Sequence, residues 1–282
     1  MMASQSTVGI LHPGSMGAAV AACAKPKARR VLWCPTDRSA ATAARAESHG
    51  LEAVAKLDDL LRQADIVLSL CPPAAAEEMA RAVAECGFAG IYVEANAISP
   101  ERMARIVAVL DGPARAVVDG AVVGSPPVHG KRTRLYLAGE PEAVSQVEAL
   151  FADSLVETPV LGSEVGQASA LKLAYTAYQK ASRVLAAEAY GAARAHGVEA
   201  ALLDIAGKRP GSYLVETGYI PKTAARAWRW GPEMDEAADM LSAAGLPDEV
   251  LRAVARTLDR WADSKDLAGL TPDEALDRLA RP

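Results

Sequence analysis

The sequence predicts an α/β fold in which an N-terminal Rossmann domain, a doubly wound parallel sheet, precedes an all-α C-terminal domain. Short apolar runs alternate with helical segments up to residue 162, which is typical of parallel strands joined by helices. A glycine-rich turn follows the first of these runs. The stretch from Gly166 to Ala195 has no proline and one internal glycine, which predicts a helix of about 45 Å.

The first domain is expected over residues 1–162 and the second over residues 163–282. The predicted strands of the first domain are Thr7–Leu11, Arg30–Trp33, Ala53–Val54, Asp65–Leu70, Ile91–Glu94, Ala116–Asp119, Arg132–Ala138 and Leu155–Val160. Its predicted helices are Ala18–Ala24, Ala40–Ser48, Leu57–Gln63, Ala74–Glu85, Pro100–Val109 and Pro141–Ala152. In the second domain we expect helices Glu199–Ala206, Ile220–Arg229, Asp235–Ala244, Asp248–Trp261 and Pro272–Leu279.

Composition narrows the classes of protein to consider. The 282 residues are 51% hydrophobic and 23% charged, with a net charge of -5, so nucleic acid and anionic membrane surfaces are not expected partners. No apolar run reaches the length of a membrane span, and the first seven residues lack the apolar core of a signal peptide, so we expect a cytoplasmic protein. The cysteines show no metal-ligand spacing, which favours reduced thiols and no metal site.

The turn after the first strand predicts a dinucleotide site. Its residues are His12, Pro13, Gly14, Ser15, Met16 and Gly17. The usual fingerprint has three glycines, and here His12 occupies the first position. Gly14 would let the backbone approach a pyrophosphate, and Gly17 would let helix and strand pack closely. The free N–H groups that open the helix would hold the phosphates, while His12 is either a cofactor contact or a turn residue.

The end of the second strand favours NADP over NAD. An NAD site has an acid about twenty residues after the glycines, and that position is Cys34. Thr36, Arg38 and Ser39 follow, and an arginine with hydroxyl groups suits a 2′-phosphate. The alternative is that Arg38 is a solvated loop residue. Cys71, Pro72 and Asn96 end the fourth and fifth strands at the same edge, where we expect Asn96 to meet the nicotinamide ribose.

Two further segments are expected near the substrate. The sixth strand ends in Asp119–Pro127, whose small residues allow backbone amides to approach a ligand. Lys172 and Thr176 share one face of the long helix, close to the joint between the domains. Lys172 is therefore a candidate acid–base group, and the alternative is an ordinary helix lysine.

Taken in order, the glycine turn, Asn96-Ala-Ile-Ser-Pro100, Asp119-Gly-Ala-Val-Val-Gly-Ser125 and the Gly162–Lys172 joint resemble the β-hydroxyacid dehydrogenase superfamily. This superfamily includes 3-hydroxyisobutyrate dehydrogenase, 6-phosphogluconate dehydrogenase and the imine reductases. The resemblance spans almost the whole chain and is greatest to the branch with a C-terminal domain of unknown function. It implies a catalytic role for Lys172, and a substrate loop of Val122, Val123, Gly124 and Ser125. The family serine is Val123 here, and the family asparagine after the lysine is Thr176.

The second domain is expected to mediate assembly. A helix of about 45 Å cannot bury its surface inside one small helical domain, so we expect a homodimer. The resemblance implies that residues 228–234 close over the partner's cleft, where Trp228, Trp230 and Met234 would line the substrate site. The alternative is that these three side chains belong to the core.

These observations predict an NADP-dependent oxidoreductase acting on a small-molecule carbonyl or hydroxy compound, with Lys172 and Thr176 as catalytic residues. A reductase acting on a cyclic or apolar imine is the second hypothesis, because the sequence does not separate the two reactions. A non-catalytic NADP-sensing protein is the third, although such a protein would not need Lys172.

Overall fold

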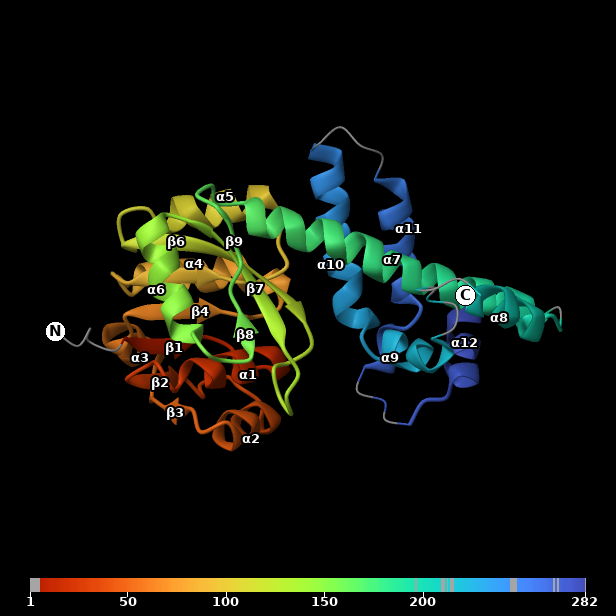
Figure 1. The fold of residues 1–282 in the computed structure, drawn as a ribbon, viewed down its shortest axis with the longest axis horizontal. Coiled ribbons are helices and arrows are strands. Elements are labelled where there is room, and N and C mark those ends of the chain that lie inside the picture. The colour runs from red at the N-terminus through yellow and green to blue at the C-terminus, as the bar shows by residue number, and fades with distance from the viewer. Residues whose placement is uncertain are drawn as a thin grey trace. The chain divides into compact units, whose positions relative to one another are not determined.

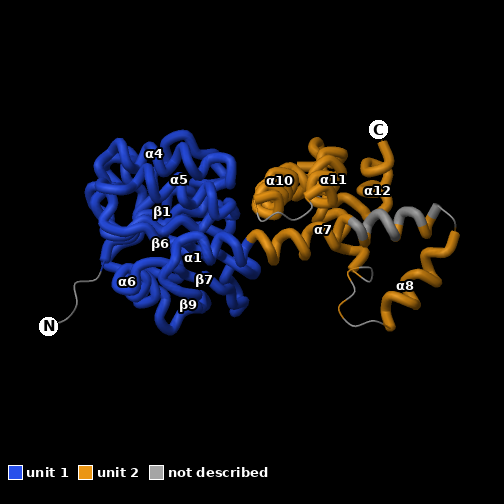
Figure 2. Tube along the Cα trace, turned by 90° about the horizontal axis from the view of Figure 1, so that it is seen from above, with its two compact units in different colours: residues 1–172 blue, residues 173–282 orange. Residues whose placement is uncertain are grey.

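The computed structural model describes residues 6–281 except 196, 209–210, 212, 214–215, 244–247, 266 and 268. The chain divides into two compact units, Met1–Lys172 and Leu173–Pro282 (Figure 2). This division falls ten residues after the predicted boundary at 162, because the first turns of the long helix make their contacts with unit 1. Each unit is described by itself below.

Unit 1 contains the predicted doubly wound sheet (Figure 1). Its strands are β1 (Thr7–Ile10), β2 (Arg30–Trp33), β3 (Glu52–Ala53), β4 (Ile66–Ser69), β5 (Ile91–Glu94), β6 (Ala116–Gly124), β7 (Thr133–Gly139), β8 (Val156–Glu157) and β9 (Val160–Gly162). The order is β3-β2-β1-β4-β5-β6-β7-β8, with β9 also paired to β7. The strands from β3 to β6 are parallel, and β7 runs antiparallel to β6.

Helices cover both faces of this sheet, and each face has its own apolar core. The helices are α1 (Ser15–Ala24), α2 (Ala40–Ser48), α3 (Leu57–Gln63), η1 (Pro73–Ala75), α4 (Ala76–Glu85), α5 (Pro100–Leu110) and α6 (Pro141–Phe151). Side chains of α1, α2 and α6 pack in one core and those of α3, α4 and α5 in the other. The central strands β1, β4 and β5 are buried throughout, as their continuous apolar sequence predicts.

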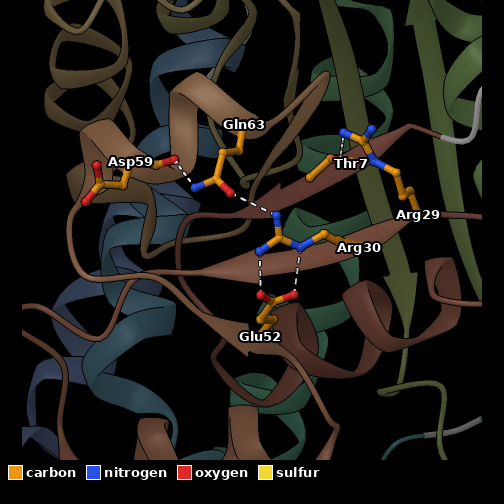
Figure 3. A network of polar contacts seen from close by, with 6 residues as sticks. All are labelled: Thr7, Arg29, Arg30, Glu52, Asp59 and Gln63. Atoms are coloured by element: carbon orange, nitrogen blue, oxygen red, sulfur yellow. Dashed lines mark hydrogen bonds and ion pairs between the residues drawn. The ribbon is translucent and has the colours of Figure 1, made fainter.

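Polar contacts fasten the β2–β3 edge of the sheet (Figure 3). The Arg30 guanidinium forms an ion pair with Glu52 on β3 and donates to Gln63 on α3 over 2.8 Å. Gln63 in turn donates to the backbone oxygen of Asp59 over 2.7 Å. Arg30 on β2 therefore contacts both β3 and α3 through its side chain.

One prediction for unit 1 was wrong in a way that affects the site. The sixth strand was expected to end at Asp119 and give way to a loop, but β6 continues to Gly124. The reason is β7, whose residues Thr133–Gly139 pair with Val118–Gly124 in an antiparallel ladder. Val122, Val123 and Gly124 therefore lie on a strand, and only Ser125 follows it.

Unit 2 is helical in its described residues, as predicted. The helix α7 (Gln167–Ala195) has 29 residues and runs from unit 1 into unit 2. The elements after it are α8 (Glu199–Gly207), η3 (Thr217–Tyr219), α9 (Ile220–Ala224), α10 (Ala227–Ala243), α11 (Glu249–Asp259), η4 (Ala262–Ser264) and α12 (Pro272–Ala280). A helix ending near Arg229 and a second from Asp235 were predicted, whereas α10 runs through Pro232. Pro232 has no N–H to donate to the Trp228 oxygen, so the helix continues past it with one helical hydrogen bond fewer. Within the described residues, no helix is both long and apolar enough to span a bilayer.

Candidate functional site

The glycine turn presents an uncapped helix end at the carboxyl edge of the sheet. Gly14 is the N-cap of α1, and having no side chain it forms no cap hydrogen bond. Its own N–H donates to the His12 oxygen over 2.8 Å, which closes the tight turn. The first N–H groups of α1 have no helical acceptor and carry the positive end of the helix dipole. This arrangement fits the pyrophosphate of a dinucleotide.

Gly17 performs the packing role that the sequence predicts. A Cβ at this position would lie 2.5 Å from the backbone oxygen of His12 and 3.4 Å from the Cβ of Leu70. No side chain fits there unless the backbone moves. A Cβ on Gly14, in contrast, would meet only the ring of His12, at 3.4 Å. Gly17 is thus required by the fold, whereas Gly14 leaves its outer side open for a ligand.

Two arginines lie against the glycine turn. Arg38 donates to the backbone oxygen of Leu11 over 3.3 Å, and Arg45 on α2 donates to that of Pro13 over 3.3 Å. Burial lowers the pKa of His12, and the charges of Arg38 and Arg45 lower it further. The Nε atom of Arg38 is buried and has no hydrogen-bond partner. Two positively charged side chains therefore lie against the glycine turn.

Thr36 and Ser39 have structural roles in this segment. Thr36 donates to the oxygen of Ala55 over 3.1 Å. Ser39 caps α2 by accepting from the N–H of Thr42 over 3.2 Å. Both hydroxyl oxygens can still accept a further hydrogen bond.

Asn96 lies in a buried polar cluster where β4 and β5 end. Its amide nitrogen donates to Ser69 Oγ over 3.1 Å and to Cys71 Sγ over 3.3 Å. Its amide oxygen is buried and unpartnered, which costs about 1–3 kcal/mol unless a ligand supplies a donor. Ser99 then caps α5, with Pro100 as its first residue, as the sequence predicts. Pro72 is exposed beside this cluster.

The carboxyl group of Glu94 is fully buried in the same cluster. It accepts from the N–H of Asn96 over 3.0 Å and from the hydroxyl of Tyr92 over 3.2 Å. Burial raises the pKa of Glu94 to about 8, and burial also raises the pKa of the Cys71 thiol to about 11. Both groups are therefore mainly protonated at neutral pH.

Asp119 on β6 fastens the start of α7. One carboxylate oxygen, Oδ2, accepts from the N–H groups of Gly166, Ala168 and Ser169 over 2.8, 2.9 and 3.0 Å. The other, Oδ1, accepts from the Ser169 hydroxyl over 2.7 Å. Gly166 has a φ of 106°, a conformation that favours glycine. We call this set of contacts the Asp119 clamp.

The Asp119 clamp sets the position of Lys172. The lysine follows Ser169 by one helical turn, and its Nζ donates to the backbone oxygen of Val122 over 2.7 Å. Asp119 and Val122 belong to the same strand, so β6 holds both the start of α7 and the amine that projects from it. The structure therefore brings Lys172 to the predicted substrate segment.

The remaining predicted substrate residues differ in whether they are exposed or buried. Gly124 and Ser125 are exposed, and the backbone oxygen of Val123 accepts from the Thr133 hydroxyl over 3.0 Å. Thr176 is buried one turn after Lys172. Trp230 and Met234 are buried, which favours the core interpretation, whereas Trp228 is 41% exposed and lies under the Lys265 ammonium.

Sequence reasoning gave no role to Arg45, Glu94, Asp119 or Ser169. An acid directly after a run of apolar residues is a signal of a buried carboxyl group, and both Glu94 and Asp119 follow such a run. Arg45 gave no signal, because a helix arginine is usually solvated. In the described part of the chain, no group of three His, Cys, Asp or Glu side chains is arranged to hold a metal.

Known families match both parts of the chain. Residues 2–85 match the NAD-binding domain of D-isomer specific 2-hydroxyacid dehydrogenases, and residues 193–261 match the domain of unknown function DUF1932. An uncharacterised 28.5 kDa protein of Methanothermus fervidus is 26% identical over 209 residues, which are 74% of this chain and 79% of that protein.

Solved structures share the fold over nearly the full length. A conserved protein of unknown function, described as similar in structure to 3-hydroxyacid dehydrogenases, is 26% identical with a TM-score of 0.66, covering 92% of this chain and 97% of that one. The 3-hydroxyisobutyrate dehydrogenase of Mycobacterium tuberculosis is 18% identical with a TM-score of 0.76, and the match covers 98% of this chain and 100% of that one. A reductive aminase of Aspergillus terreus was solved with NADPH, cyclohexanone and allyl amine. It is 16% identical with a TM-score of 0.59, and the match covers 97% of this chain and 99% of that one.

The last two likenesses concern the fold alone, while the family matches concern the sequence itself. A match to a NAD-binding dehydrogenase domain is thus followed along this chain by a match to DUF1932, on a fold shared with 3-hydroxyisobutyrate dehydrogenases and imine reductases. These matches confirm the predicted resemblance to the β-hydroxyacid dehydrogenase superfamily, in its DUF1932 branch.

Proposed function

We propose that the protein is an NADPH-dependent oxidoreductase of the β-hydroxyacid dehydrogenase type, with Lys172 as its acid–base residue. The observation that carries this proposal is the position of the Lys172 amine, 2.7 Å from the Val122 oxygen on the strand that also fixes the start of α7. The uncapped end of α1 and the unpartnered amide oxygen of Asn96 stand at the carboxyl edge of the same sheet.

The residues of this edge fit a bound NADP. The N–H groups of Ser15 and Met16 would hold the pyrophosphate, Arg38 and Arg45 the 2′-phosphate, and the Asn96 oxygen a hydroxyl or amide donor of the nicotinamide riboside. The cofactor, when bound, supplies or accepts hydride. The protein then has to move a proton at the oxygen or nitrogen of the substrate, and Lys172 carries transferable protons at the required edge.

The substrate side favours a small molecule with an apolar part. Val123 stands where the family has serine, and Thr176 where it has asparagine, so this chain offers fewer hydrogen bonds to a carboxylate. This supports reduction of an apolar imine as the second candidate function. Such a substrate can arrive already protonated, so it would depend less on Lys172.

We further propose that the protein is a homodimer formed through α7. Leu171, Tyr175 and Tyr178 are exposed and recur at four- and three-residue steps, which places them on one face of this helix. Sedimentation is the test: a species of about 59 kDa, twice the chain mass of 29.4 kDa, is expected at micromolar concentration. A species of chain mass would overturn the dimer.

The test of cofactor choice is a binding titration with NADPH and NADH. NADPH should bind more tightly, and Arg38→Ala should reduce the difference roughly tenfold to a hundredfold, since a charge-assisted hydrogen bond contributes about 1.5–3 kcal/mol. Arg105→Ala, which removes an arginine of α5 that pairs with Glu77, is the matched control. Tighter binding of NADH by the wild type would contradict the choice of NADP.

The test of the enzyme itself is NADPH oxidation with a panel of keto acids, aldehydes and cyclic imines. Turnover with one class identifies the reaction. Tight NADPH binding without turnover of any panel member would favour a non-catalytic, NADP-sensing protein.

A further inference from the structure

Four buried or half-buried side chains surround Asn96, and the proposed chemistry uses none of them. They form, with Asn96 itself, what we call the Glu94 cluster: Ser69, Cys71, Tyr92, Glu94 and Asn96. The cluster lies where β4 and β5 end, which is the edge at which a doubly wound sheet binds its nucleotide.

Asn96 is held at three points within the Glu94 cluster. Its amide nitrogen donates to Ser69 and Cys71, and its backbone N–H donates to Glu94 over 3.0 Å. These contacts fix both the backbone and the donor end of the side chain. The amide oxygen is left buried and unpartnered, so it is oriented in advance to accept a hydrogen bond from a ligand.

The surroundings of Glu94 carry no compensating positive charge. Tyr92 and Cys71 are neutral, and Asp119, which stands beside Glu94 in the register of β5 and β6, is acidic. On the covering helices α4 and α5, Arg102 pairs with Glu77. Burial is the largest influence on the pKa of Glu94 and raises it to about 8, and among the described residues no lysine or arginine charge is one of the groups that shift it.

We propose that Glu94 is a positioning residue that orients Asn96 toward the cofactor and holds or releases a proton according to the charge of the nicotinamide ring. This inference rests on the proposed function, because it requires a nicotinamide cofactor at this edge. The oxidised ring carries a positive charge and the reduced ring does not. In a site of low dielectric constant, the positive ring stabilises the Glu94 carboxylate, and the neutral ring leaves the carboxylic acid.

The proton balance follows directly. When oxidised cofactor binds at pH 7, the O–H bond of the Glu94 carboxyl group would break and its proton would pass to the buffer, leaving the Glu94 carboxylate. When reduced cofactor binds, Glu94 keeps its proton. Oxidised cofactor should therefore bind more tightly as the pH rises toward 8, whereas the affinity for reduced cofactor should lack this contribution.

Isothermal titration of the full-length protein with NADP⁺ and NADPH, at pH 7 in two buffers of different ionisation enthalpy, counts the protons released. Both forms carry the same 2′-phosphate, so its titration cancels in the difference. We expect NADP⁺ to release roughly one more proton than NADPH. Equal proton release by the two forms would overturn the proposal and leave the cofactor site intact. Failure of both forms to bind would overturn the proposed function, and this inference with it.

Two variants separate positioning from charge. Glu94→Gln keeps an acceptor for the Asn96 N–H and cannot ionise, so NADPH should bind within about threefold of wild type, whereas NADP⁺ should bind roughly tenfold more weakly at pH 7 and the difference in proton release should disappear. Glu94→Ala also removes the acceptor and should weaken both forms about tenfold. A proton difference that persists in Glu94→Gln would assign the proton to another group and contradict the proposal.

Discussion

Two buried carboxyl groups, Glu94 and Asp119, stand side by side in the register of β5 and β6 and have opposite surroundings. Asp119 accepts four hydrogen bonds, and three of them come from backbone N–H groups at the positive end of α7. Glu94 accepts from Asn96 and Tyr92. Burial raises the pKa of both groups, but the four donors oppose the rise at Asp119, while Glu94 reaches about 8.

The comparison shows that burial alone does not decide whether a carboxyl group is charged. An ionised carboxylate needs donors in place of the water it loses, and the start of a helix supplies them. We therefore expect Asp119 to be a carboxylate that fixes α7 and Lys172, and Glu94 to be a carboxylic acid that fixes Asn96. Asp119 thus has a structural role, whereas Glu94 can lose its proton near neutral pH.

The largest effect on stability should come from Asp119→Ala. It leaves three buried N–H groups and the Ser169 hydroxyl without an acceptor, so the free energy of unfolding should fall by about 3–5 kcal/mol. Urea denaturation measures this. Glu94→Ala is the matched comparison and should cost less, because fewer donors lose their partner. A larger fall in the free energy of unfolding for Glu94→Ala than for Asp119→Ala would contradict the difference proposed between the two carboxyl groups.

The second effect is a pH dependence of stability caused by Glu94. The unfolded chain gives this group its ordinary pKa of 4.5, and the fold raises the pKa to about 8, so the folded protein keeps the proton between these values. The contribution to stability is full below pH 4.5 and is lost as the pH rises to about 8, by at most about 4–5 kcal/mol. Denaturation at pH 5, 6, 7 and 8 measures the slope.

Glu94→Gln should remove this pH slope, because the amide is neutral throughout. Glu78→Gln, which changes an exposed glutamate of α4, is the control and should keep it. An unchanged slope in Glu94→Gln would show that Glu94 is ionised in the folded protein and that the two carboxyl groups do not differ.

A smaller effect is expected from Ser169→Ala. It removes one donor to Asp119 and leaves the three backbone N–H groups in place, so stability should fall by about 1 kcal/mol. The free energy of unfolding from the same urea experiment gives the value. A loss as large as that of Asp119→Ala would mean that the hydroxyl, rather than the helix end, neutralises the carboxylate.

The smallest effect concerns Tyr92, whose hydroxyl donates to Glu94 over 3.2 Å. Tyr92→Phe removes a bond that favours the ionised form, so the pKa of Glu94 should rise further, by less than about one unit. Carbon NMR of labelled glutamate follows this titration. A fall in the pKa would show that the hydroxyl bond favours the protonated form of Glu94.

The sequence was sufficient for the sheet, its helices and the glycine turn, because these depend on local periodicity and on residues with special backbone geometry. Gly17 could be assigned a packing role in advance for that reason. The extent of β6 could not, because it depends on pairing with β7, a separate strand that begins at Thr133. The passage of α10 through Pro232 was missed because proline normally marks a helix end.

In the candidate site, the sequence singled out residues that belong to motifs, and it gave no role to the residues that position them. Lys172 and Asn96 were proposed from motifs. Asp119 acts through contacts distant in sequence, and Glu94 accepts from Tyr92 and Asn96, each two positions away, without belonging to a motif. Asp119 reaches residues almost fifty positions later. Such contacts leave no pattern in a single sequence beyond a charged residue at the end of an apolar strand.

The measurement that tests the central claim most directly is the turnover of Lys172→Ala with the substrate class found in the panel. We expect turnover to fall by about 10²–10⁴-fold while NADPH affinity stays nearly unchanged, because the amine acts on the proton and not on the cofactor. Lys208→Ala, which removes an exposed lysine paired with Asp204, should keep the wild-type rate. Wild-type turnover by Lys172→Ala would contradict the assignment of Lys172 as the acid–base residue.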